Sequence, residues 1–366
     1  MEFWKNKNSL LLITLLVCSN ILRGQTNSMD PKLVSQIEAE RYFRVMFYNC
    51  ENLFDIYDDS LTNDNEFLPK GEKYWSKNRY YTKLNQISKV ITAVGGWKAP
   101  EIVGLCEVEN KKVLNDLIYN TQLYRSEYKL IHKDSPDNRG IDVALLYQPK
   151  AFKPLCTEFI KVNFPEKHFR PTRDILYTKG LTKDRDTIHI FINHWPSRWG
   201  GQLETEDKRM FTASVVKRKV DSINSNSLNA NIIIIGDLND FTTNKSLTKV
   251  LQANNSLEQI SPNKLYNLSH TLEHTLNLGS HKYQGKWGIL DQIIVSGSLL
   301  QNQTLYTSIE KAGIFNASFL IENDESNIGK RPFRTYRGYK YIGGYSDHLP
   351  VFFDLLKGSK QCNTKP

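Results

Sequence analysis

The sequence lacks several features that would assign it to a specialised class of protein. Its five cysteines include no Cys-x-x-Cys pair, which argues against a zinc site built from cysteines. It has no internal repeat and no collagen-like or low-complexity composition, so fibrous and wholly disordered chains are excluded. What remains is an ordinary globular composition of 366 residues, 40% hydrophobic and 24% charged, with enough apolar material for a large core.

The apolar run near the N-terminus is too short to span a membrane comfortably. It covers residues 10–17, follows Lys5 and Lys7, and is followed by Gly24 just before Gln25. A basic start, a short apolar run and a small residue at the cleavage point are typical of a secretory signal peptide. We therefore expect cleavage after Gly24 and a secreted or periplasmic protein with no transmembrane anchor.

Cys18 offers a second interpretation of the N-terminus, as the acylated cysteine of a lipoprotein. Leu16 and Val17 are bulky where a lipoprotein site has small residues, so we favour the cleaved signal peptide at 1–24. Beyond it we expect three parts: a leader segment at 25–41, one folded domain at 42–357 and a C-terminal tail at 358–366.

The charge balance is moderately basic. The formal net charge is +9, and residues 1–24 carry three cationic side chains and one acidic one, so the mature chain keeps about +7. Such an excess favours phosphate-rich partners such as nucleic acids, through counterion release and electrostatic steering. Many secreted proteins are basic without such a partner, so charge alone does not decide the function.

One stretch, residues 231–241, organises the rest of the sequence. Four consecutive isoleucines at 232–235 predict a strand that is buried on both faces, inside a sandwich of layers. The run then ends in Asp237, Leu238 and Asn239. In extended chain Asp237 and Asn239 share one face, so a carboxylate and a carboxamide project together where the core meets water. A strand that simply runs into an Asx turn is the plainer alternative.

Other predicted strands end in the same way. Apolar runs deliver polar side chains at seven further positions: Asn49, Glu107, Asp142, His194, Asp291, Asp347 and His348. Alternation turns Cys50 and Cys106 away from their polar neighbours, so we expect them to be buried as small hydrophobic residues. So many acids, amides and histidines at strand ends indicate a single functional rim.

Helical spacing of apolar residues appears between these strands. We expect helices at 79–94, from Lys111, at 204–223 and near 245–253. The segment 73–81 interleaves lysines and an arginine with tyrosines and a tryptophan, which suits stacking on bases and neutralising phosphates. The alternative is a solvated loop held by packed aromatic side chains.

The chemistry of the rim points to phosphoryl transfer. Hard oxygen ligands without cysteine favour Mg²⁺ or Mn²⁺ over zinc. Two histidines with carboxylate partners can supply a general base and a general acid for in-line displacement at phosphorus.

Seven motifs, in their order along the chain, give the sequence a family resemblance. They are NCENLFD at 49–55, GLCEVEN at 104–110, RGIDVALLY at 139–147, NHWPSR at 193–198, IGDLND at 235–240, ILDQIIV at 289–295 and YSDHLPV at 345–351. Together they resemble the endonuclease/exonuclease/phosphatase superfamily. The resemblance implies an α/β fold of the DNase I type, a four-layer αββα sandwich of two mixed, mostly antiparallel sheets flanked by helices. It also implies that residues 42–357 form a catalytic domain.

The resemblance assigns a role to each matching position. Glu107 and Asn49 would hold the catalytic Mg²⁺ or Mn²⁺, with help from Asp347. The sequence leaves open whether a structural Ca²⁺ supports a loop. We expect a monomer.

The resemblance also implies the catalytic groups. His348, paired with Asp291, would be the base that activates water. Asp237 and Asn239 would orient the water and the scissile phosphate. His194 would be the acid or a group that contacts the phosphate.

The remaining assignments concern support and substrate. Asp142 would orient His194, and Arg173, Asn193 and Arg198 would bind the substrate. Phe191 stands where abasic-site nucleases of this fold have tyrosine, which argues against a repair enzyme, as does the export signal.

Three functions follow from the resemblance. The first is a secreted nuclease acting on DNA or RNA. The second is a phosphodiesterase or phosphatase acting on a phospholipid, an inositol phosphate or another phosphorylated small molecule. Related sphingomyelinases dock on membranes with apolar hairpins, whereas here only Trp195 and Trp199 are apolar candidates near the site. The third is a catalytically silent binding module, which the complete set of acid, base and metal positions argues against.

Overall fold

The computed structural model describes residues 43–166, 169–301 and 304–358. The expected signal peptide, the leader, Cys18, Cys362 and all but the first residue of the tail lie outside these ranges. Within them, no helix is both long and apolar enough to cross a membrane.

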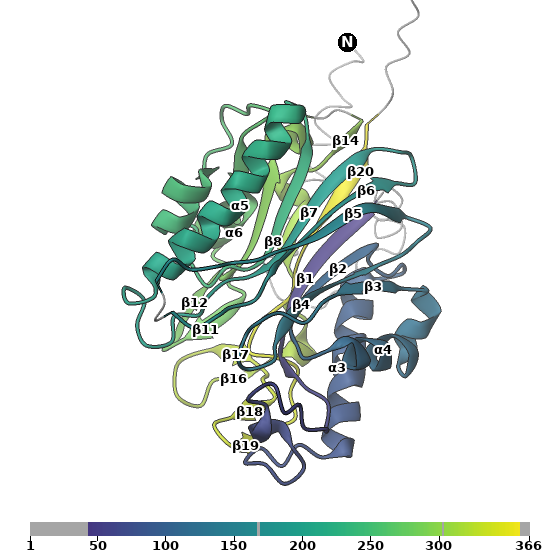
Figure 1. The fold of residues 1–366 in the computed structure, drawn as a ribbon, viewed down its shortest axis with the longest axis vertical. Helices are drawn as coiled ribbons and strands as arrows, with labels where there is room; N and C mark the ends of the chain where they lie inside the picture. Colours follow the sequence, from purple (N-terminus) through teal and green to yellow (C-terminus); the bar gives the residue numbers. More distant parts are fainter. Residues whose placement is uncertain (1–42, 167–168, 302–303, 359–366) are drawn as a thin grey trace, which may run out of the picture. The chain divides into compact units, whose positions relative to one another are not determined.

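Two seven-stranded sheets form the centre of the described body (Figure 1). The first has the spatial order β14 (Leu305–Tyr306), β20 (Val351–Lys357), β1 (Phe43–Leu53), β2 (Ile102–Val108), β4 (Asp142–Tyr147) and β3 (Lys129–His132), and β15 (Ala312–Ile314) also pairs with β20. Strands β1 and β2 are parallel, while β1–β20 and β2–β4 are antiparallel. The sheet is therefore mixed, as predicted.

The second sheet has the order β5 (Phe152–Ile160), β6 (Ile175–Thr182), β7 (Thr187–His194), β8 (Asn231–Asp237), β13 (Asp291–Ser296), β10 (Leu265–Asn267) and β9 (Ala253–Asn254). Strands β7 and β8 run parallel at its centre, and β13 is antiparallel to β8. The functional rim is built at the end of these three strands.

The isoleucine run shows why the sheets stack. Ile233 and Ile235 belong to the core that both sheets share, whereas Ile232 and Ile234 belong to a second core on the other face of β8. A strand with apolar side chains on both faces must be covered on both. The sheets approach closely at Gly104 of β2, where an added Cβ would lie 2.8 Å from the Ile192 Cδ1 atom of β7. The prediction of a strand buried on both faces is confirmed.

Helices cover the outer faces and complete the four layers (Figure 1). Helices α3 (Lys77–Gly95) and α4 (Lys111–Tyr119) place their apolar residues in the same core as β1 and β2. Helix α5 (Glu206–Asn226) packs in the second core with β8. Two shorter elements are the π-helix η3 (Ser246–Leu251) and α6 (Leu268–His274). The predicted αββα sandwich is confirmed, and all four expected helical segments are present.

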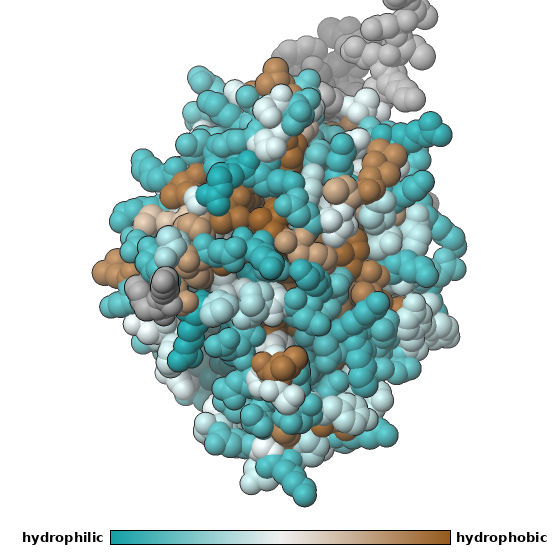
Figure 2. Space-filling view, viewed as in Figure 1, coloured by the Kyte–Doolittle hydropathy of each residue, from teal (hydrophilic) through white to brown (hydrophobic). Residues whose placement is uncertain are grey.

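Within the described ranges, three hairpins and five 3-10 turns lie outside the two central sheets, and the sequence patterns did not predict them. The hairpins are β11–β12 (His281–Tyr283 and Lys286–Gly288), β16–β17 (Ile321–Asn323 and Lys330–Pro332) and β18–β19 (Tyr336–Arg337 and Lys340–Tyr341). The 3-10 turns are η1 (Asn65–Phe67), η2 (Gln122–Ser126), η4 (Gly297–Leu300), η5 (Ile309–Lys311) and η6 (Ser318–Leu320). Figure 2 shows mostly hydrophilic side chains on the face viewed in Figure 1, with apolar side chains in scattered groups.

Candidate active site

Three neighbouring strands of the second sheet place polar residues side by side. In the β7–β8 ladder His194 is opposite Asp237, and in the β8–β13 ladder Asp291 is opposite the same Asp237. All three side chains are almost completely buried. The backbone ladder therefore fixes an imidazole and two carboxylates in one row, with Asp237 in the middle.

Asn193 lies beneath this row and serves the fold. Its side chain is fully buried, donates to the Ile235 carbonyl and accepts from the Trp195 indole N–H. Gly236 is needed beside it, because an added Cβ would lie 2.2 Å from the Asn193 carbonyl oxygen. The expectation that Asn193 binds substrate is wrong, since strand alternation turns it away from the face that carries His194.

The first sheet supplies Asn49 and Glu107 at irregular strand ends. The β1–β2 register shifts between Asn49 and Leu53, and the β2–β4 register shifts between Cys106 and Val108. Bulges of this kind re-aim side chains and are common beside active sites. Cys106 and Cys50 are fully buried and unbridged, as expected.

Left-handed backbone gathers at the same rim. Glu51, Asn52, Glu107 and Asn239 have φ values of +49°, +58°, +57° and +50°. Such conformations are uncommon in residues with a Cβ and accumulate where a site demands them. Both sheets thus end in strained turns that direct polar side chains toward each other.

The side chains from both sheets converge on one oxygen atom, Asp237 Oδ2. It lies 3.1 Å from Asn49 Nδ2, 3.7 Å from His194 Nε2 and 3.9 Å from His348 Nε2. Glu107 Oε1 lies 3.4 Å from Asn49 Nδ2 and 3.9 Å from His194 Nε2. Residues spread over three hundred positions therefore meet within side-chain reach, as the sequence predicted.

His348 is paired with Asp291 as predicted. Its Nδ1 lies 2.7 Å from Asp291 Oδ2, which also accepts from the Ser280 hydroxyl at 2.6 Å. Burial opposes the charged imidazole, but Asp291 and Asp237 outweigh it and hold the pKa of His348 well above its usual value. The remaining ring nitrogen, Nε2, faces Asp237 and the centre of the site.

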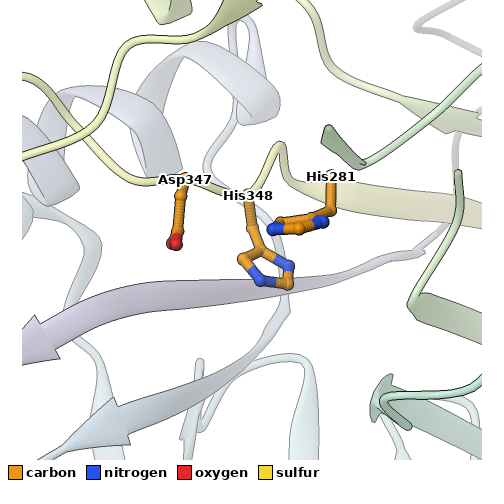
Figure 3. A group of neighbouring side chains, drawn as sticks. All are labelled: His281, Asp347 and His348. Atoms are coloured by element: carbon orange, nitrogen blue, oxygen red, sulfur yellow. The ribbon is translucent and has the colours of Figure 1, made fainter. Parts of the chain in front are cut away.

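His281 is a neighbour that the sequence patterns did not reveal. Figure 3 shows its ring beside that of His348, with Asp347 on the adjoining loop; the His281–His348 ring centroids are 4.7 Å apart. An isolated backbone bridge joins the same two residues. Burial and the charge of His348 lower the pKa of His281 to about 4, so this ring is neutral at neutral pH. The sequence signal for His281 is weak: it stands ten residues before Asp291, and in the structure it begins β11.

His194 occupies a different electrostatic environment from His348. Burial, followed by the charges of Arg173 and Arg139, lowers the pKa of His194 well below its usual value. Its Nδ1 is buried and has no hydrogen-bond partner among the described residues. The structure therefore favours a neutral imidazole whose Nε2 faces the carboxylates of Asp237 and Glu107.

Asp142 does not orient His194, contrary to the prediction. Its Oδ1 accepts from the Ser135 backbone N–H at 2.9 Å, and its Oδ2 lies 3.3 Å from His132 Nε2. Asp142 ends the pairing of β2 with β4, so it faces the loop at 132–135.

Arg173 holds the backbone behind His194 and is not a phosphate ligand in this structure. It is 4% exposed, pairs with Asp137 at 2.9 Å, and donates to the carbonyls of His194 and Trp195. The predicted substrate contact is therefore replaced by a positioning role. Its charge still acts on the site, because it lowers the pKa of His194.

Arg198 has a similar supporting role in this structure, and its contact with substrate stays a prediction. It donates to the Asn239 carbonyl at 2.7 Å, pairs with Asp240 at 3.2 Å and stacks on Phe241 at 4.1 Å. Asn239 in turn donates to the Trp195 carbonyl. These bonds hold the turn after β8 against the turn after β7.

Asp347 is paired with an arginine that the sequence analysis left unassigned. Arg334 Nη2 lies 3.0 Å from Asp347 Oδ2, and Arg334 Nε lies 3.1 Å from Glu51 Oε1. Although burial opposes ionisation, Arg334 and His348 lower the pKa of Asp347 to about 2. Three arginines at 331–337, shortly before the SDH motif, were the available sequence signal.

The donor set fits a hard divalent cation. Five carboxylates, those of Glu51, Glu107, Asp237, Asp291 and Asp347, crowd one largely buried region. Burial and the nearby Asp291 raise the pKa of Asp237 to about 7, and the buried Asp291 Oδ1 has no hydrogen-bond partner among the described residues. Asp237, Asp291 and His348 offer ligand atoms within 4.8 Å of one another, as do His281, Asp347 and His348. The carboxylate oxygens of this region are the ligand type that suits Mg²⁺ or Mn²⁺, whereas the group with two histidines is not oxygen-rich.

Asn49 contributes differently from the prediction. Its Oδ1 accepts from the Glu51 backbone N–H, so its Nδ2 is the atom that faces Glu107 and Asp237. In this arrangement Asn49 donates hydrogen bonds to Glu107 and Asp237, and its oxygen does not face a cation held by them. Glu107 and Asp237 each keep a carboxylate oxygen within 4 Å of His194 Nε2.

Two residues of the basic-aromatic segment at 73–81 belong to the core, and the rest are partly buried or exposed. Trp75 and Tyr80 are buried, and Arg79 donates to the carbonyls of Lys73 and Tyr74. Lys73 itself packs over Tyr336, 5.0 Å from its ring centroid. The alternative of a loop held by packed aromatic side chains is therefore the better description.

Comparison with known proteins agrees with this geometry. The family model described as "Endonuclease/Exonuclease/phosphatase family" matches residues 44–357. A comparison with curated protein sequences gives no significant match.

Solved structures show the same fold at low sequence identity. A mannosyl-6-phosphatase of Bacteroides thetaiotaomicron matches with TM-score 0.54 and 15% identity over 86% of this chain and 99% of its own. The human Nocturnin catalytic domain matches with TM-score 0.52 and 15% identity over 86% and 93%. TDP2 of D. rerio, complexed with a single-strand DNA product, matches with TM-score 0.51 and 12% identity over 86% and 98%.

Proposed function

The chain belongs to the endonuclease/exonuclease/phosphatase family, and from this premise we propose that it is a divalent-cation-dependent nuclease. One observation carries the proposal: the His348–Asp291 pair, Asn49, Glu107 and His194 all meet around the carboxylate of Asp237. Acids, an amide and two imidazoles in one buried cluster are the groups that phosphodiester hydrolysis requires. The basic charge of the chain favours a polyanionic substrate.

His348 is the general base in this proposal. Mg²⁺ or Mn²⁺, when bound, would be held by Glu107 and Asp237 and would supply positive charge against the phosphate and the surrounding acids. His348 Nε2 faces the centre of the site, where the neutral ring can accept a proton from the attacking water. Asp291 then stabilises the charged ring through Nδ1, at 2.7 Å in the structure.

His194 contacts the phosphate in this proposal. Its lowered pKa keeps the ring neutral at neutral pH, which makes it a poor proton donor but a good hydrogen-bond donor. Its Nε2 lies within 4 Å of Asp237 and Glu107, where the scissile phosphate must approach the acids. Two roles were predicted for His194, the general acid and a group that contacts the phosphate. Its lowered pKa supports the phosphate contact.

The proposed site of action is outside the cytoplasm. The basic start, the apolar run at 10–17 and Gly24 support export with removal of residues 1–24. An exported nuclease degrades nucleic acid for nutrient recovery or defence, and such a role does not require sequence specificity. Cleavage after Gly24 can be checked by N-terminal sequencing of the protein from culture medium and periplasm.

The experiment that tests the function compares substrates directly. Purified protein without residues 1–24 is incubated with plasmid DNA, RNA, bis-nitrophenyl phosphate, sphingomyelin and mannose 6-phosphate, with Mg²⁺, Mn²⁺ or EDTA. We expect nucleic acid to be cleaved with either cation and not with EDTA. Release of phosphate from the monoester, without cleavage of any diester, would contradict the nuclease assignment.

A phospholipid substrate is the second candidate, and one structural observation favours it. The hairpin β11–β12 begins at His281, next to His348, and exposes Tyr283 by 68% and Trp287 by 36%. Aromatic side chains on a hairpin beside a site are suited to a membrane interface. The sphingomyelin arm of the experiment tests this candidate, and binding to liposomes is its independent measurement.

A further inference from the structure

A pocket lies beside the proposed catalytic centre. It has a volume of about 180 Å³ and is lined by Glu51, Asn52, Phe67, Lys73, Arg334 and Tyr336, among others. Its wall is shared with the site, because the Asn52 backbone N–H donates to Glu107 Oε2 at 2.9 Å and Arg334 bonds Asp347. A group attached to a phosphate at the site can therefore reach this pocket.

The pocket contains two cations with unused donors. Arg334 is 41% exposed and uses Nε for Glu51 and Nη2 for Asp347, while Nη1 makes no hydrogen bond within the described residues. Lys73 donates to the Gly338 carbonyl at 2.9 Å and lies 3.7 Å from the exposed Glu66. A lysine has three donors and an arginine five, so both can take a further acceptor.

The acidic member of the pocket, Glu51, is paired with one of the two cations. Both oxygens of Glu51 are already bonded, one by Arg334 Nε and the other by the Thr335 backbone N–H at 2.6 Å. The Lys73 ammonium is held in place by the rings of Phe67 and Tyr336, at 5.8 and 5.0 Å from their centroids. The cation is therefore positioned in advance, which lowers the entropic cost of binding.

From this geometry we propose that the pocket binds a second phosphate of the substrate, adjacent to the scissile one. The proposal rests on the proposed phosphodiesterase function and defines its substrate class as phosphodiesters that carry a neighbouring phosphate. Arg334 and Lys73 are the residues that bind this group. The neighbouring phosphate can come from a nucleic-acid strand or from a phosphorylated sugar such as an inositol phosphate.

The test compares substrates that differ by one phosphate. The first pair compares thymidine dinucleotide, which has a single diester, with the same dinucleotide phosphorylated at its 5′ end or at its 3′ end. The second pair is glycerophosphoinositol with and without a ring phosphate. In the wild type we expect kcat/KM to rise about tenfold with the added phosphate, as one charge-assisted contact predicts. The pair that shows the rise identifies the source of the phosphate.

The decisive variant is Lys73→Met, which removes the charge and keeps a stem that packs on the rings. It should abolish the advantage of the phosphorylated substrate and leave kcat/KM for the simple diester within about twofold. Lys70→Met is the matched control, since Lys70 is exposed on the same loop and does not line the pocket. Lys73→Arg should restore most of the advantage.

Equal losses on both members of a pair, or the same loss in Lys70→Met, would overturn the proposal. If Lys73→Met unfolds, Arg334→Gln is assayed with the same pairs, and a preference unchanged from wild type overturns it as well. Binding of the phosphorylated dinucleotide is also measured in EDTA, where no cleavage occurs, by calorimetry. If the wild type hydrolyses no diester, the proposed function fails, while this binding measurement still decides whether the pocket prefers the extra phosphate.

Discussion

The two halves of the candidate site are held together in different ways. The strand half consists of His194, Asp237 and Asp291, which sit opposite one another in the ladders of β7, β8 and β13. The loop half consists of Arg334, Asp347 and His348, on the chain that leads into β20. Backbone hydrogen bonds of long strand ladders fix the first half, whereas the second is held by an isolated backbone bridge to His281, by backbone bonds of its own loop and by side chains from distant elements.

Part of the support of the loop half comes from helix α3. The buried Lys83 ammonium donates to Thr335 Oγ1 and to the Tyr345 carbonyl, both at 2.5 Å, and Gln86 donates to the Gly343 carbonyl. Strands in a ladder keep their backbone hydrogen bonds when one side chain changes. A loop held by a few side chains can shift when one of them is lost. The difference implies that single side-chain changes should disturb the position of the loop half more than that of the strand half.

The largest effect should come from the residue that joins the halves. His348→Ala removes the proposed base and leaves Asp291 without its partner, so turnover of a nucleic-acid substrate should fall about a thousandfold. Steady-state kinetics with plasmid DNA measure this, and an unchanged melting temperature shows that the fold is intact. Turnover within tenfold of wild type would mean that the loop half does not supply the base.

A smaller effect is expected within the strand half. His194→Ala should lower kcat about a hundredfold, because it removes a donor to the phosphate. Asp142→Asn is the matched comparison: its partners are Ser135 and His132, so turnover should stay close to wild type. A large loss in Asp142→Asn would revive the predicted link to His194, which the structure does not show.

The support from α3 can be removed by Lys83→Met. Two buried acceptors, Thr335 Oγ1 and the Tyr345 carbonyl, then lose their donor, and the free energy of unfolding should fall by about 2 kcal/mol. Urea denaturation followed by circular dichroism measures the change. Stability equal to that of the wild type would show that the loop half is held by other contacts.

The smallest of these effects concerns the cation. Glu107→Gln keeps the shape of the side chain and removes its charge, so the Mg²⁺ concentration for half-maximal activity should rise about tenfold. Titration of activity against Mg²⁺ gives this value, with Glu109→Gln on the following turn as the matched acid. An identical titration curve for Glu107→Gln and wild type would exclude Glu107 as a cation ligand.

The strand half was predictable from the sequence, because its information is local. The isoleucines at 232–235 identify a strand covered on both faces, and alternation then places Asp237 at its end. Strand alternation also turns the Asn193 side chain inward. Its predicted contact with substrate came from the NHWPSR motif, which does not show the face of the strand. The roles predicted for Arg173 and Asp142 differ from their contacts in the structure for a related reason. A motif fixes where a residue stands in the sequence, but it does not fix which residue it contacts.

The sequence by itself determined the residues that end the strands, because strand alternation and burial are properties of neighbouring residues. The family and the four layers followed from the resemblance that the seven motifs carry. Only the tertiary structure decided the partners: Arg334 for Asp347, His281 beside His348, and Asp137 for Arg173. These contacts join residues that are 13 to 67 positions apart. They depend on packing that no short window of sequence contains.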